Sequence, residues 1–533
     1  MKHAALWWQE GVIYQIYPRS LMDSNGDGIG DIAGIMEKVD YLQDLGVDAI
    51  WLSPLYPSPD VDFGYDVSHY TDIDPKFGSL EEFDRLVKTA EKSGVHIIMD
   101  LVLNHSSDQH AWFMQSRVSR NNPYKDWYIW QDAKPDGKPP NNWLSVFGGS
   151  GWEWNDDRQQ FYYHMFTKEQ PDLNWRNPQV RRNIMDVLKF WLDRGVKGFR
   201  LDVFNVYFKD KLLRDNPQQS FGLRPFDRQQ HIYDCNRSEL MDLLAEMRSI
   251  LDSYQDAYMV GETFLSTPHK AASYCGDEML HQAFNFTFLE CGWQAQRFSR
   301  AVENWESMLG ASNWPNYVLN NHDVIRSATR YGIGEDDERL KLAAVMLLTL
   351  RGTPFMYYGE EIGMRNIRLT RSQVMDPVGK KYWPFHKGRD GYRSPMQWDA
   401  SLNSGFSTGK PWLPLHKNYH SRNVAEQSQN ASSLLSCYRD LLSLRRQHAV
   451  LRQGSITIMD GMPGGVFAYE RRLTNQTIIV LLNFMKVRRQ IPLSRNGKNW
   501  QLIFSTKGVN TDISTESVWL AADEGLVLQE IDA

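Results

Sequence analysis

Residues 79–105, SLEEFDRLVKTAEKSGVHIIMDLVLNH, place a helical pattern directly before a strand pattern. Apolar residues recur at helical spacing as far as residue 94, and a short run rich in apolar and β-branched residues follows. Alternation of helix and strand at this spacing is typical of a parallel sheet that is covered by helices. The stretch therefore predicts an α/β fold.

Strand patterns of the same kind recur along most of the chain. They are found in GVIYQIYPRS (11–20), DAIWLSPLY (48–56), VKGFRLDVF (196–204), AYMVGETF (257–264), NYVLNNHD (316–323) and GTPFMYYGEE (352–361). AFNFTF (283–288) is a weaker candidate for an eighth strand, and IAGIMEKVDYLQDLG (32–46) predicts helix between the first two. Eight repeats favour a closed (β/α)₈ TIM barrel over an open doubly wound sheet.

Two intervals break this rhythm. Residues 106–172 are rich in Trp, Asn, Pro and Gly and show no clear helical period, which indicates a subdomain inserted after the third strand. From residue 455 onwards short strands alternate with turns, which indicates a C-terminal all-β sandwich domain. We therefore predict a barrel over residues 1–105 and 173–454, an inserted subdomain over 106–172, and a C-terminal domain over 455–533.

The composition is that of an ordinary globular protein, with 42% hydrophobic and 23% charged residues. A net charge of −6, without long runs of one sign, gives no reason to expect binding to nucleic acid or to an anionic membrane. The N-terminus lacks an apolar stretch of signal-peptide length, and no run elsewhere approaches the roughly 18 apolar residues of a membrane span, so we expect a cytoplasmic protein. The four cysteines lack CxxC spacing, which argues against a zinc site and a disulfide framework.

Three acids stand at the ends of predicted strands. Asp202 ends GFRLD, Glu262 ends MVGE and Asp323 ends LNNHD. In a (β/α)₈ barrel the carboxyl ends of the strands meet at one face, where the working residues gather. An apolar strand gains nothing structurally from a terminal acid, so three of them on one face indicate a functional site.

Carboxylates that face each other across a gap are what glycoside hydrolysis requires. One must be ionised, to attack or stabilise the anomeric carbon, and the other must keep a proton for the leaving oxygen. Arg200 projects from the same strand face as Asp202, so we expect it to hold that carboxylate ionised. Glu262 has no basic residue near it in the sequence and is therefore the better candidate for the acid and base.

With these residues the chain resembles the α-amylase superfamily of glycosidases. The four signature regions of that superfamily are matched, in order, by DLVLNH (100–105), GFRLD (198–202), VGE (260–262) and NNHD (320–323). Motifs of its oligo-1,6-glucosidase/α-glucosidase branch are matched by GYD (64–66), QPDLNW (170–175), GTPFMYYGEE (352–361) and RSPMQWD (393–399). The resemblance runs from about residue 7 to the C-terminal domain.

This resemblance implies a retaining mechanism, with Asp202 as nucleophile, Glu262 as general acid and base, and Asp323 as stabiliser of the transition state. The carboxyl groups of a retaining pair lie about 5–5.5 Å apart. The resemblance also implies a glucose pocket that is formed by Asp62, Tyr65, His105, Phe166, Gln170, Arg200, His322 and Arg393. Tyr65 and Phe166 offer faces to the sugar ring. Asp62 and Arg393 are expected to pair and to grip its non-reducing hydroxyls, which would make the enzyme exo-acting.

The bond that is cut depends on the residue after the predicted nucleophile, Val203. In the resembled branch, Val at this position goes with α-1,6-glucosidases, whereas Thr, Ala or Gly goes with α-1,4-specific maltases. AFNFTFLECGW (283–293) and TLRGTPFMYYGEEIGM (349–364) look more like maltase-type sequences. We favour α-1,6 bonds such as that of isomaltose, with α-1,4 bonds such as that of maltose as the alternative.

The loop DSNGDGIGD (23–31) opens like an EF-hand, but Gly34 stands where the final Glu ligand would be. In the resembled branch the loop after the first strand binds Ca²⁺. The ligands that this implies are the side chains of Asp23, Asn25, Asp27 and Asp31 and the carbonyl of Ile29. Hard oxygen ligands suit Ca²⁺ best, with Mg²⁺ as the alternative, and a glycine-rich turn without metal is the third interpretation. No organic cofactor is expected.

The main hypothesis is an exo-acting α-glucosidase whose partner is a small oligosaccharide substrate. A transglucosylase or isomerase of the same branch would share every catalytic residue. A non-catalytic binding or transporter-associated subunit is the remaining hypothesis. It predicts the loss of one or more of the three acids and the presence of a membrane helix, whereas all three acids are present and no apolar run of that length is found. The sequence gives no indication of the oligomeric state.

Overall fold

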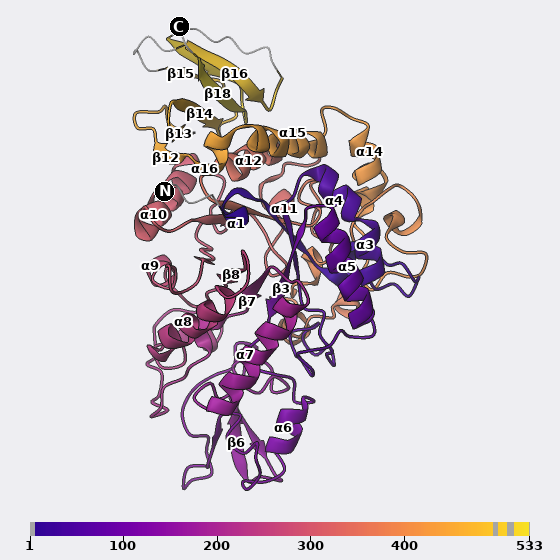
Figure 1. Cartoon of the computed structure of the whole chain (residues 1–533), viewed down its shortest axis with the longest axis vertical. Helices are drawn as coiled ribbons and strands as arrows, with labels where there is room; N and C mark the ends of the chain where they lie inside the picture. Colours follow the sequence, from indigo (N-terminus) through magenta and orange to yellow (C-terminus); the bar gives the residue numbers. More distant parts are fainter. Residues whose placement is uncertain (1–5, 494–498, 509–515, 532–533) are drawn as a thin grey trace.

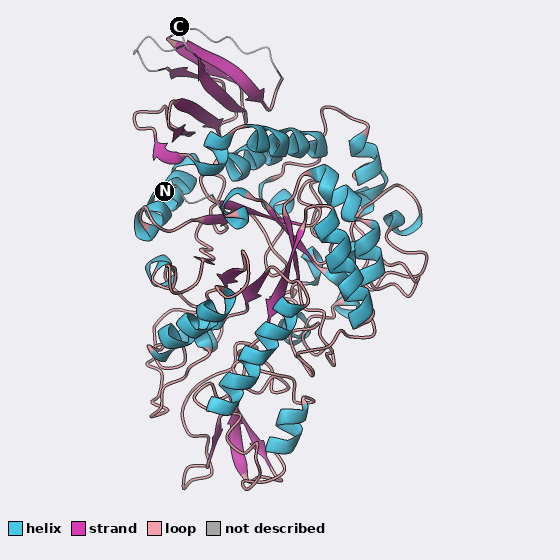
Figure 2. Ribbon diagram, viewed as in Figure 1, coloured by secondary structure: helices cyan, strands magenta, loops and turns pink. Residues whose placement is uncertain are grey.

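One parallel sheet contains the eight expected strands in the computed structural model, which describes residues 6–493, 499–508 and 516–531. The strands are β1 (Ile13–Ile16), β2 (Ala49–Leu52), β3 (His96–Leu101), β7 (Gly198–Leu201), β8 (Tyr258–Gly261), β9 (Gln282–Ala283), β10 (Asn316–Val318) and β11 (Thr353–Tyr357). Their order in the sheet is β10-β11-β1-β2-β3-β7-β8-β9, and helices surround them (Figures 1 and 2). The predicted TIM barrel is confirmed.

Helices cover the outside of this sheet. The main ones are α3 (Ile32–Glu37), α4 (Val39–Leu45), α5 (Leu80–Lys92), α7 (Pro178–Asp193), α8 (Glu239–Leu251), α10 (Ala295–Leu309), α12 (Glu338–Thr349) and α15 (Leu434–Gln447). Most are amphipathic, whereas α12 is buried over nearly its whole length. Ser79 starts α5 with a capping box, because its hydroxyl accepts from the amide of Glu82 while the Glu82 carboxylate accepts from the amide of Ser79. The helical segment 32–46 is divided at Lys38, whose amide donates to Ile35 at 3.0 Å and so tightens the turn between α3 and α4.

The eighth strand is shorter than expected and lies at the start of the predicted segment. β9 contains only Gln282 and Ala283, and β9 and β10 are the two ends of the strand order. Side-chain amides join these ends. Gln282 Nε2 donates to the carbonyl of Pro315 at 2.9 Å, and Asn316 Nδ2 donates to the carbonyl of Ala283 at 3.2 Å.

Inside the barrel an apolar layer lies below a polar one. Inward-facing residues of the apolar layer pack in one buried cluster, which includes Ile13, Trp51, Ile98, Tyr258, Val260, Val318 and Phe355. Successive side chains of a strand alternate between faces, so the residue two positions further on also points inward. Gln15 follows Ile13, Asp100 follows Ile98, and Glu262 follows Val260 in this way. The strands thus raise polar side chains towards the carboxyl face.

The inserted segment between β3 and β7 forms a sheet of its own at the end of the molecule opposite the C-terminal strands (Figure 1). Its strands are β4 (Trp130–Gln131), β5 (Trp152–Asn155) and β6 (Gln160–Tyr163), in the order β4-β6-β5. The segment also contains a short helix, α6 (Ala111–Ser116), which the irregular sequence pattern did not indicate.

The C-terminal strands pack as two antiparallel sheets. One sheet has the order β12 (Ser455–Ile458), β13 (Val466–Leu473), β14 (Gln476–Asn483), β18 (Gly525–Ile531), β16 (Asn499–Ser505), and the other pairs β15 (Arg489–Pro492) with β17 (Ser517–Leu520). Leu481 and Leu528 of the first sheet share a buried cluster with Ile491 and Val518 of the second. The predicted β-sandwich is confirmed. The predicted domain limits stay predictions, and two of them, residues 1 and 533, lie outside the described residues. Among the described residues no helix is both long and apolar enough to cross a bilayer.

Candidate active site

A cavity of about 400 Å³ opens at the carboxyl face of the barrel. Most of the predicted site residues line it, namely Asp62, Tyr65, His105, Phe166, Gln170, Asp202, Val203, Glu262 and Asp323. Arg200, His322 and Arg393 are fully buried behind this wall and contact the lining residues. A wider, open groove of about 1010 Å³ adjoins the cavity and shares Thr263, Leu265, Phe286 and Glu290 with it.

Arg200 joins three carboxylates at the floor of the cavity. Its Nη1 atom lies 2.7 Å from Asp202 Oδ1 and 2.7 Å from Asp100 Oδ1, and its Nη2 atom is paired with Glu262. The predicted pairing of Arg200 with Asp202 is confirmed. Glu262 has no basic residue near it in the sequence, but Arg200 reaches it from the adjacent strand, because β7 and β8 are neighbours in the sheet.

Burial dominates the protonation of this pair. It raises the pKa of Glu262, and it raises the pKa of Asp202 although the charge of Arg200 opposes the shift. The charge of Arg200 favours the ionised form of Asp202, as predicted, but this guanidinium is shared among three buried carboxylates and does not cancel the effect of burial. Burial thus favours the protonated form at both carboxyls, which is the form that a general acid needs.

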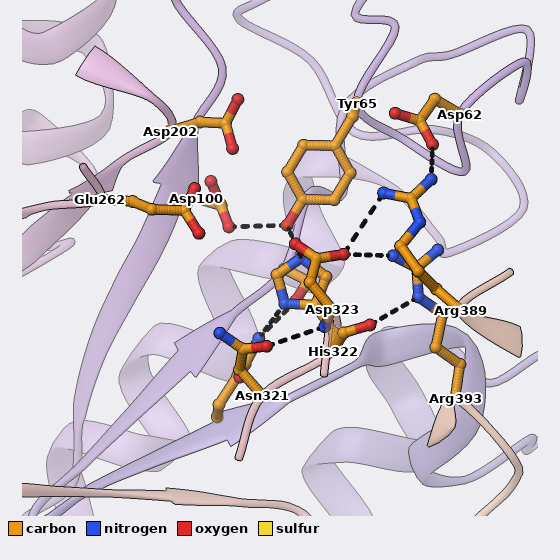
Figure 3. Close-up of polar contacts among 12 residues, drawn as sticks. Asp62, Tyr65, Asp100, Asp202, Glu262, Asn321, His322, Asp323, Arg389 and Arg393 are labelled. Atoms are coloured by element: carbon orange, nitrogen blue, oxygen red, sulfur yellow. Dashed lines mark hydrogen bonds and ion pairs between the residues drawn. The ribbon is translucent and has the colours of Figure 1, made fainter. Parts of the chain in front are cut away.

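Asp323 has a different environment, which Figure 3 shows. Arg393 Nη2 lies 2.8 Å from Asp323 Oδ1, and Arg389 Nη1 lies 3.3 Å from the same oxygen. Burial acts against ionisation of Asp323, but the charges of Arg389 and Arg393 oppose it, and the pKa of this carboxyl lies well below its usual range. Asp323 is thus the permanently ionised acid of the three.

The clamp at the closed end of the cavity differs from the predicted one. Asp62 pairs with Arg389, whereas Arg393 pairs with Asp323 and donates from Nε to the carbonyl of His322 at 2.9 Å (Figure 3). Arg389 also contacts Asp376, 2.9 Å from its Nε atom. The expected pairing of Asp62 with Arg393 is therefore wrong, because Arg389 lies between Asp62 and the two acids Asp323 and Asp376.

The aromatic side of the pocket is held together by side-chain hydrogen bonds. His105 Nε2 lies 2.9 Å from the carbonyl of Tyr65, to which Gln170 Nε2 donates at 3.0 Å. The Phe166 ring lies 5.2 Å from His105 and 6.0 Å from Phe264, measured between ring centroids. Tyr65 and Phe166 both line the cavity as predicted, and Phe264 extends the apolar wall towards the outer groove.

Val203 has an unusual backbone. Its φ and ψ angles are 36° and 39°, in the left-handed region, which a β-branched residue rarely adopts. Such strain persists where the surrounding structure fixes it, and it is concentrated at functional sites. The side chain is buried, packs with Phe264 and Val206 in one cluster, and lines the cavity beside Asp202.

The loop of residues 23–31 uses its acids as hydrogen-bond acceptors. Asp23 accepts from the amides of Gly26 and Gly28, each at 2.7 Å, and Asp31 Oδ1 accepts from the amide of Gly34 at 2.6 Å. The described residues contain no group of three or more His, Cys, Asp or Glu side chains placed to hold a metal ion. Asp23 and Asp31 are nevertheless buried, and neither forms an ion pair within the described ranges. These oxygen atoms are therefore the kind of ligand that a hard cation prefers, although in this structure they are not arranged as a coordination shell.

Two charged residues of the site were not predicted. Asp100 ends the apolar run VHIIMD, which is the same signal that identified Asp202. Arg389 stands four residues before Arg393 in a long irregular loop after β11, where no periodicity indicates the direction of its side chain. Only the three-dimensional path of that loop places it in the cavity.

Comparison with known proteins identifies the group to which this site belongs. A family described as "Alpha amylase, catalytic domain" matches residues 15–454. A probable alpha-glucosidase of Rhizobium meliloti (strain 1021) is 42% identical over 92% of both chains, and an oligo-1,6-glucosidase of Parageobacillus thermoglucosidasius is 40% identical over 90% of both. A crystal structure described as an alpha-glucosyl transfer enzyme superposes with a TM-score of 0.95 at 38% identity, covering 99% of this chain and 100% of the other. The chain belongs to the α-amylase catalytic-domain family.

Proposed function

We propose that the protein is a retaining, exo-acting α-glucosidase that removes terminal α-linked glucose from short oligosaccharides. The observation that carries this proposal is the sharing of Arg200 by Asp202 and Glu262 at the cavity floor. Two carboxylates bound to one guanidinium are close neighbours, as a retaining pair must be, whereas an inverting pair leaves room for a water molecule between its members.

In the proposed reaction the Asp202 carboxylate attacks the anomeric carbon while Glu262 gives its proton to the glycosidic oxygen. The bond to the leaving sugar breaks, and a covalent β-glucosyl ester of Asp202 forms. Glu262 then takes a proton from water, whose oxygen attacks the same carbon and releases Asp202. The product is α-glucose, and Glu262 has its proton again. Asp323, held ionised by Arg389 and Arg393, stabilises the positive charge of both transition states.

The closed end of the cavity supports exo action. Arg389 is paired with Asp62, Asp323 and Asp376, so charged side chains fill the space beyond the terminal glucose. A glucose unit in the cavity can then donate and accept hydrogen bonds at this end but cannot extend through it. The leaving sugar departs through the outer groove beside Glu290.

Retention of configuration tests the mechanism directly. Proton NMR of fresh reaction mixtures with isomaltose and with maltose is expected to show α-glucose as the first product, before mutarotation. The appearance of β-glucose first would contradict the retaining assignment. A mixture in which neither sugar is consumed would instead support the hypothesis of a non-catalytic subunit.

We further propose that Val203 favours α-1,6 over α-1,4 bonds. Val203→Thr is expected to raise the ratio of kcat/KM for maltose to that for isomaltose by about tenfold, because one buried methyl group is worth about 1–3 kcal/mol of discrimination. Val324→Thr, which makes the same change elsewhere in the cavity lining, serves as the matched control. An unchanged ratio in Val203→Thr would show that the linkage preference is set elsewhere.

The transglucosylase alternative has support of its own from the neighbour that is described as an alpha-glucosyl transfer enzyme. The wall of the cavity near Glu262 is apolar at Val203, Phe264 and Leu265. An apolar wall offers few partners to an attacking water, so a sugar acceptor competes with it. Free glucose as the main product at high substrate concentration supports the hydrolase, and new oligosaccharides or an isomerised disaccharide as the main product would support a transferase or isomerase.

We propose a structural Ca²⁺ at residues 23–31, held by the side chains of Asp23, Asn25, Asp27 and Asp31 and the carbonyl of Ile29. The support is the burial of Asp23 and Asp31, whose charges have no ion-pair partner in the part of the chain that the structure describes. Removal of calcium with a chelator is expected to lower the Tm by at least about 2 °C, because loss of a bound ion present at 100 times its Kd costs about 2.7 kcal/mol. Added Ca²⁺ should restore the Tm.

The variant Asp27→Asn gives this calcium proposal its control. Asp27 is exposed, so its replacement removes a ligand charge without disturbing the buried carboxylates. The variant should need more calcium to reach the same Tm. Metal analysis that finds neither Ca²⁺ nor Mg²⁺ in the purified protein, together with a Tm that does not respond to the chelator, would leave the glycine-rich turn as the correct interpretation.

We also propose a cytoplasmic location for the protein and a small oligosaccharide as its partner.

A further inference from the structure

Gln15 is a buried side chain of the barrel interior that the proposed reaction does not use. It lies on β1 and is 2% exposed. Its Nε2 atom lies 2.7 Å from Nδ1 of His322 and 3.3 Å from Oγ of Ser53. Gln15 does not line the cavity, so it acts on the site only through His322.

The surroundings of His322 decide which of its ring nitrogens carries hydrogen. The ring is fully buried, and burial lowers the pKa of His322 well below its usual value, so the imidazole is neutral and has one N–H group. Its Nε2 atom lies 3.2 Å from Asp323 Oδ2, and an ionised carboxylate can only accept. The hydrogen is therefore on Nε2, and Nδ1 is left as an acceptor for the amide of Gln15.

The neighbouring hydrogen bonds agree with this direction. Nε2 of His322 also lies 2.6 Å from the hydroxyl of Tyr65, and that hydroxyl donates to Asp100 Oδ2 at 3.1 Å. Donation thus runs from Gln15 to His322, from His322 to Tyr65, and from Tyr65 to Asp100, whose other oxygen binds Arg200. With the opposite direction, the lone pair of His322 Nε2 would face the Asp323 carboxylate.

The other end of the Gln15 amide shows what holds it in place. Its carbonyl oxygen is buried and has no hydrogen-bond partner among the described residues. The oxygen therefore contributes nothing to this orientation of the amide, which depends on the contacts of Nε2 with His322 Nδ1 and Ser53 Oγ. The side chain is therefore positioned to donate.

We propose that Gln15 is a positioning residue, whose side-chain N–H group fixes His322 in the tautomer that carries hydrogen on Nε2, directed at Tyr65 and Asp323. The proposal rests on the proposed glucosidase function for its catalytic consequence. Both residues at the far end of this contact line the cavity. Loss of the N–H donor would free the imidazole to exchange tautomers and to turn, and the position of Asp323 would become less well defined.

Three variants separate this role from a merely structural one. Gln15→Met keeps the length of the side chain but removes the donor, and Gln15→Glu keeps the shape but, as a carboxylate, offers only acceptors to Nδ1. Ser53→Ala removes the other contact of Gln15 and is the matched control. We expect kcat for a nitrophenyl α-glucoside to fall about 10–100-fold in Gln15→Met and Gln15→Glu with a smaller change in KM, as for other groups that orient a site residue. Ser53→Ala should stay within about twofold of the parent.

The measurement that distinguishes a positioning role of Gln15 from a merely structural one is the tautomer of His322. In protein labelled with ¹⁵N-histidine, the long-range ¹H–¹⁵N spectrum distinguishes a protonated Nε2 from a protonated Nδ1, and His322→Asn identifies the signal among the 14 histidines. We expect hydrogen on Nε2 in the parent and a new Nδ1–H signal in Gln15→Glu. The titratable groups that face His322, and that stay the same in all variants, are Tyr17, Tyr65, Asp323, Arg200, Arg389 and Arg393.

Two results would overturn the proposal. One is hydrogen on Nδ1 of His322 in the parent protein. The other is a Gln15→Met variant that keeps both the Nε2–H signal and its kcat within twofold. If Gln15→Met does not fold, Gln15→Glu, whose shape is nearly that of the original, takes its place. Failure of the proposed glucosidase function is distinguishable, because it would appear as absent turnover in the parent while the tautomer is still measured.

Discussion

Replacing Asp202 by Asn is expected to reduce the turnover of a nitrophenyl α-glucoside by about four orders of magnitude or more. The amide cannot form the glucosyl ester, so the first chemical step has no nucleophile. The substitution preserves size, and Asp202 contacts Arg200 through one oxygen, so the fold should persist. Steady-state rates and a thermal melting curve measure the two effects separately.

An external nucleophile provides the positive control for this variant. Asp202→Gly opens space beside the anomeric carbon, and azide added to it is expected to yield β-glucosyl azide, the product of a single inversion. Asp100→Asn is the matched variant, because Asp100 binds the same Arg200 nitrogen but does not line the cavity. It should retain far more activity. Substantial turnover by Asp202→Asn would show that the nucleophile is misassigned.

Replacing Glu262 by Gln is expected to have an effect that depends on the leaving group. With isomaltose, whose leaving oxygen needs a proton, the rate should fall by about 10²–10⁴-fold. With a dinitrophenyl α-glucoside the first step needs no proton, so a fast burst should precede slow hydrolysis of the ester. Rapid-quench measurements on the two substrates test this. Equal losses with both would contradict the acid role.

The pH profile of kcat/KM gives the same assignment independently. Glu262 must be protonated in the first step, and burial raises its pKa, so activity should decline on the alkaline side only above the usual range of a glutamic acid. Glu262→Gln has no proton to lose and should therefore lack this alkaline decline. An alkaline decline that persists unchanged in the variant would belong to another group.

The strand-terminal acids were predictable because two sequence signals coincide at them. Asp202 and Glu262 follow apolar strands, and the geometry of a parallel barrel brings such strand ends together whatever the intervening loops do. The same rule would have found Asp100. The pairing of Arg200 with Glu262 was missed because it joins two neighbouring strands whose residues are 62 positions apart in the sequence.

The residues contributed by long loops could not be placed in the same way. Asp62 and Arg389 are 327 positions apart, and their contact depends on the paths of the loops after β2 and β11. A local feature does hold the first of these loops. The buried carboxylate of Asp66 accepts from the amides of Val61 and Asp62, at 2.9 and 3.0 Å. The sequence shows that Asp62 and Asp66 are present, but it does not show which groups they contact. For this reason the predicted partner of Asp62 was Arg393 and not Arg389.

The amide joint between β9 and β10 has a consequence for how this barrel moves. Backbone ladders distribute strain over many hydrogen bonds, whereas here the side chains of Gln282 and Asn316 span the gap. We expect such a seam to open at a lower free energy than the backbone-paired part of the sheet. Glu262 stands at the end of β8 on one side of it, and Asp323 follows β10 on the other. We therefore expect opening of this seam to change the separation of Glu262 from Asp323 more than the separation of Glu262 from Asp202, because the strands of the latter two, β8 and β7, are joined by backbone hydrogen bonds.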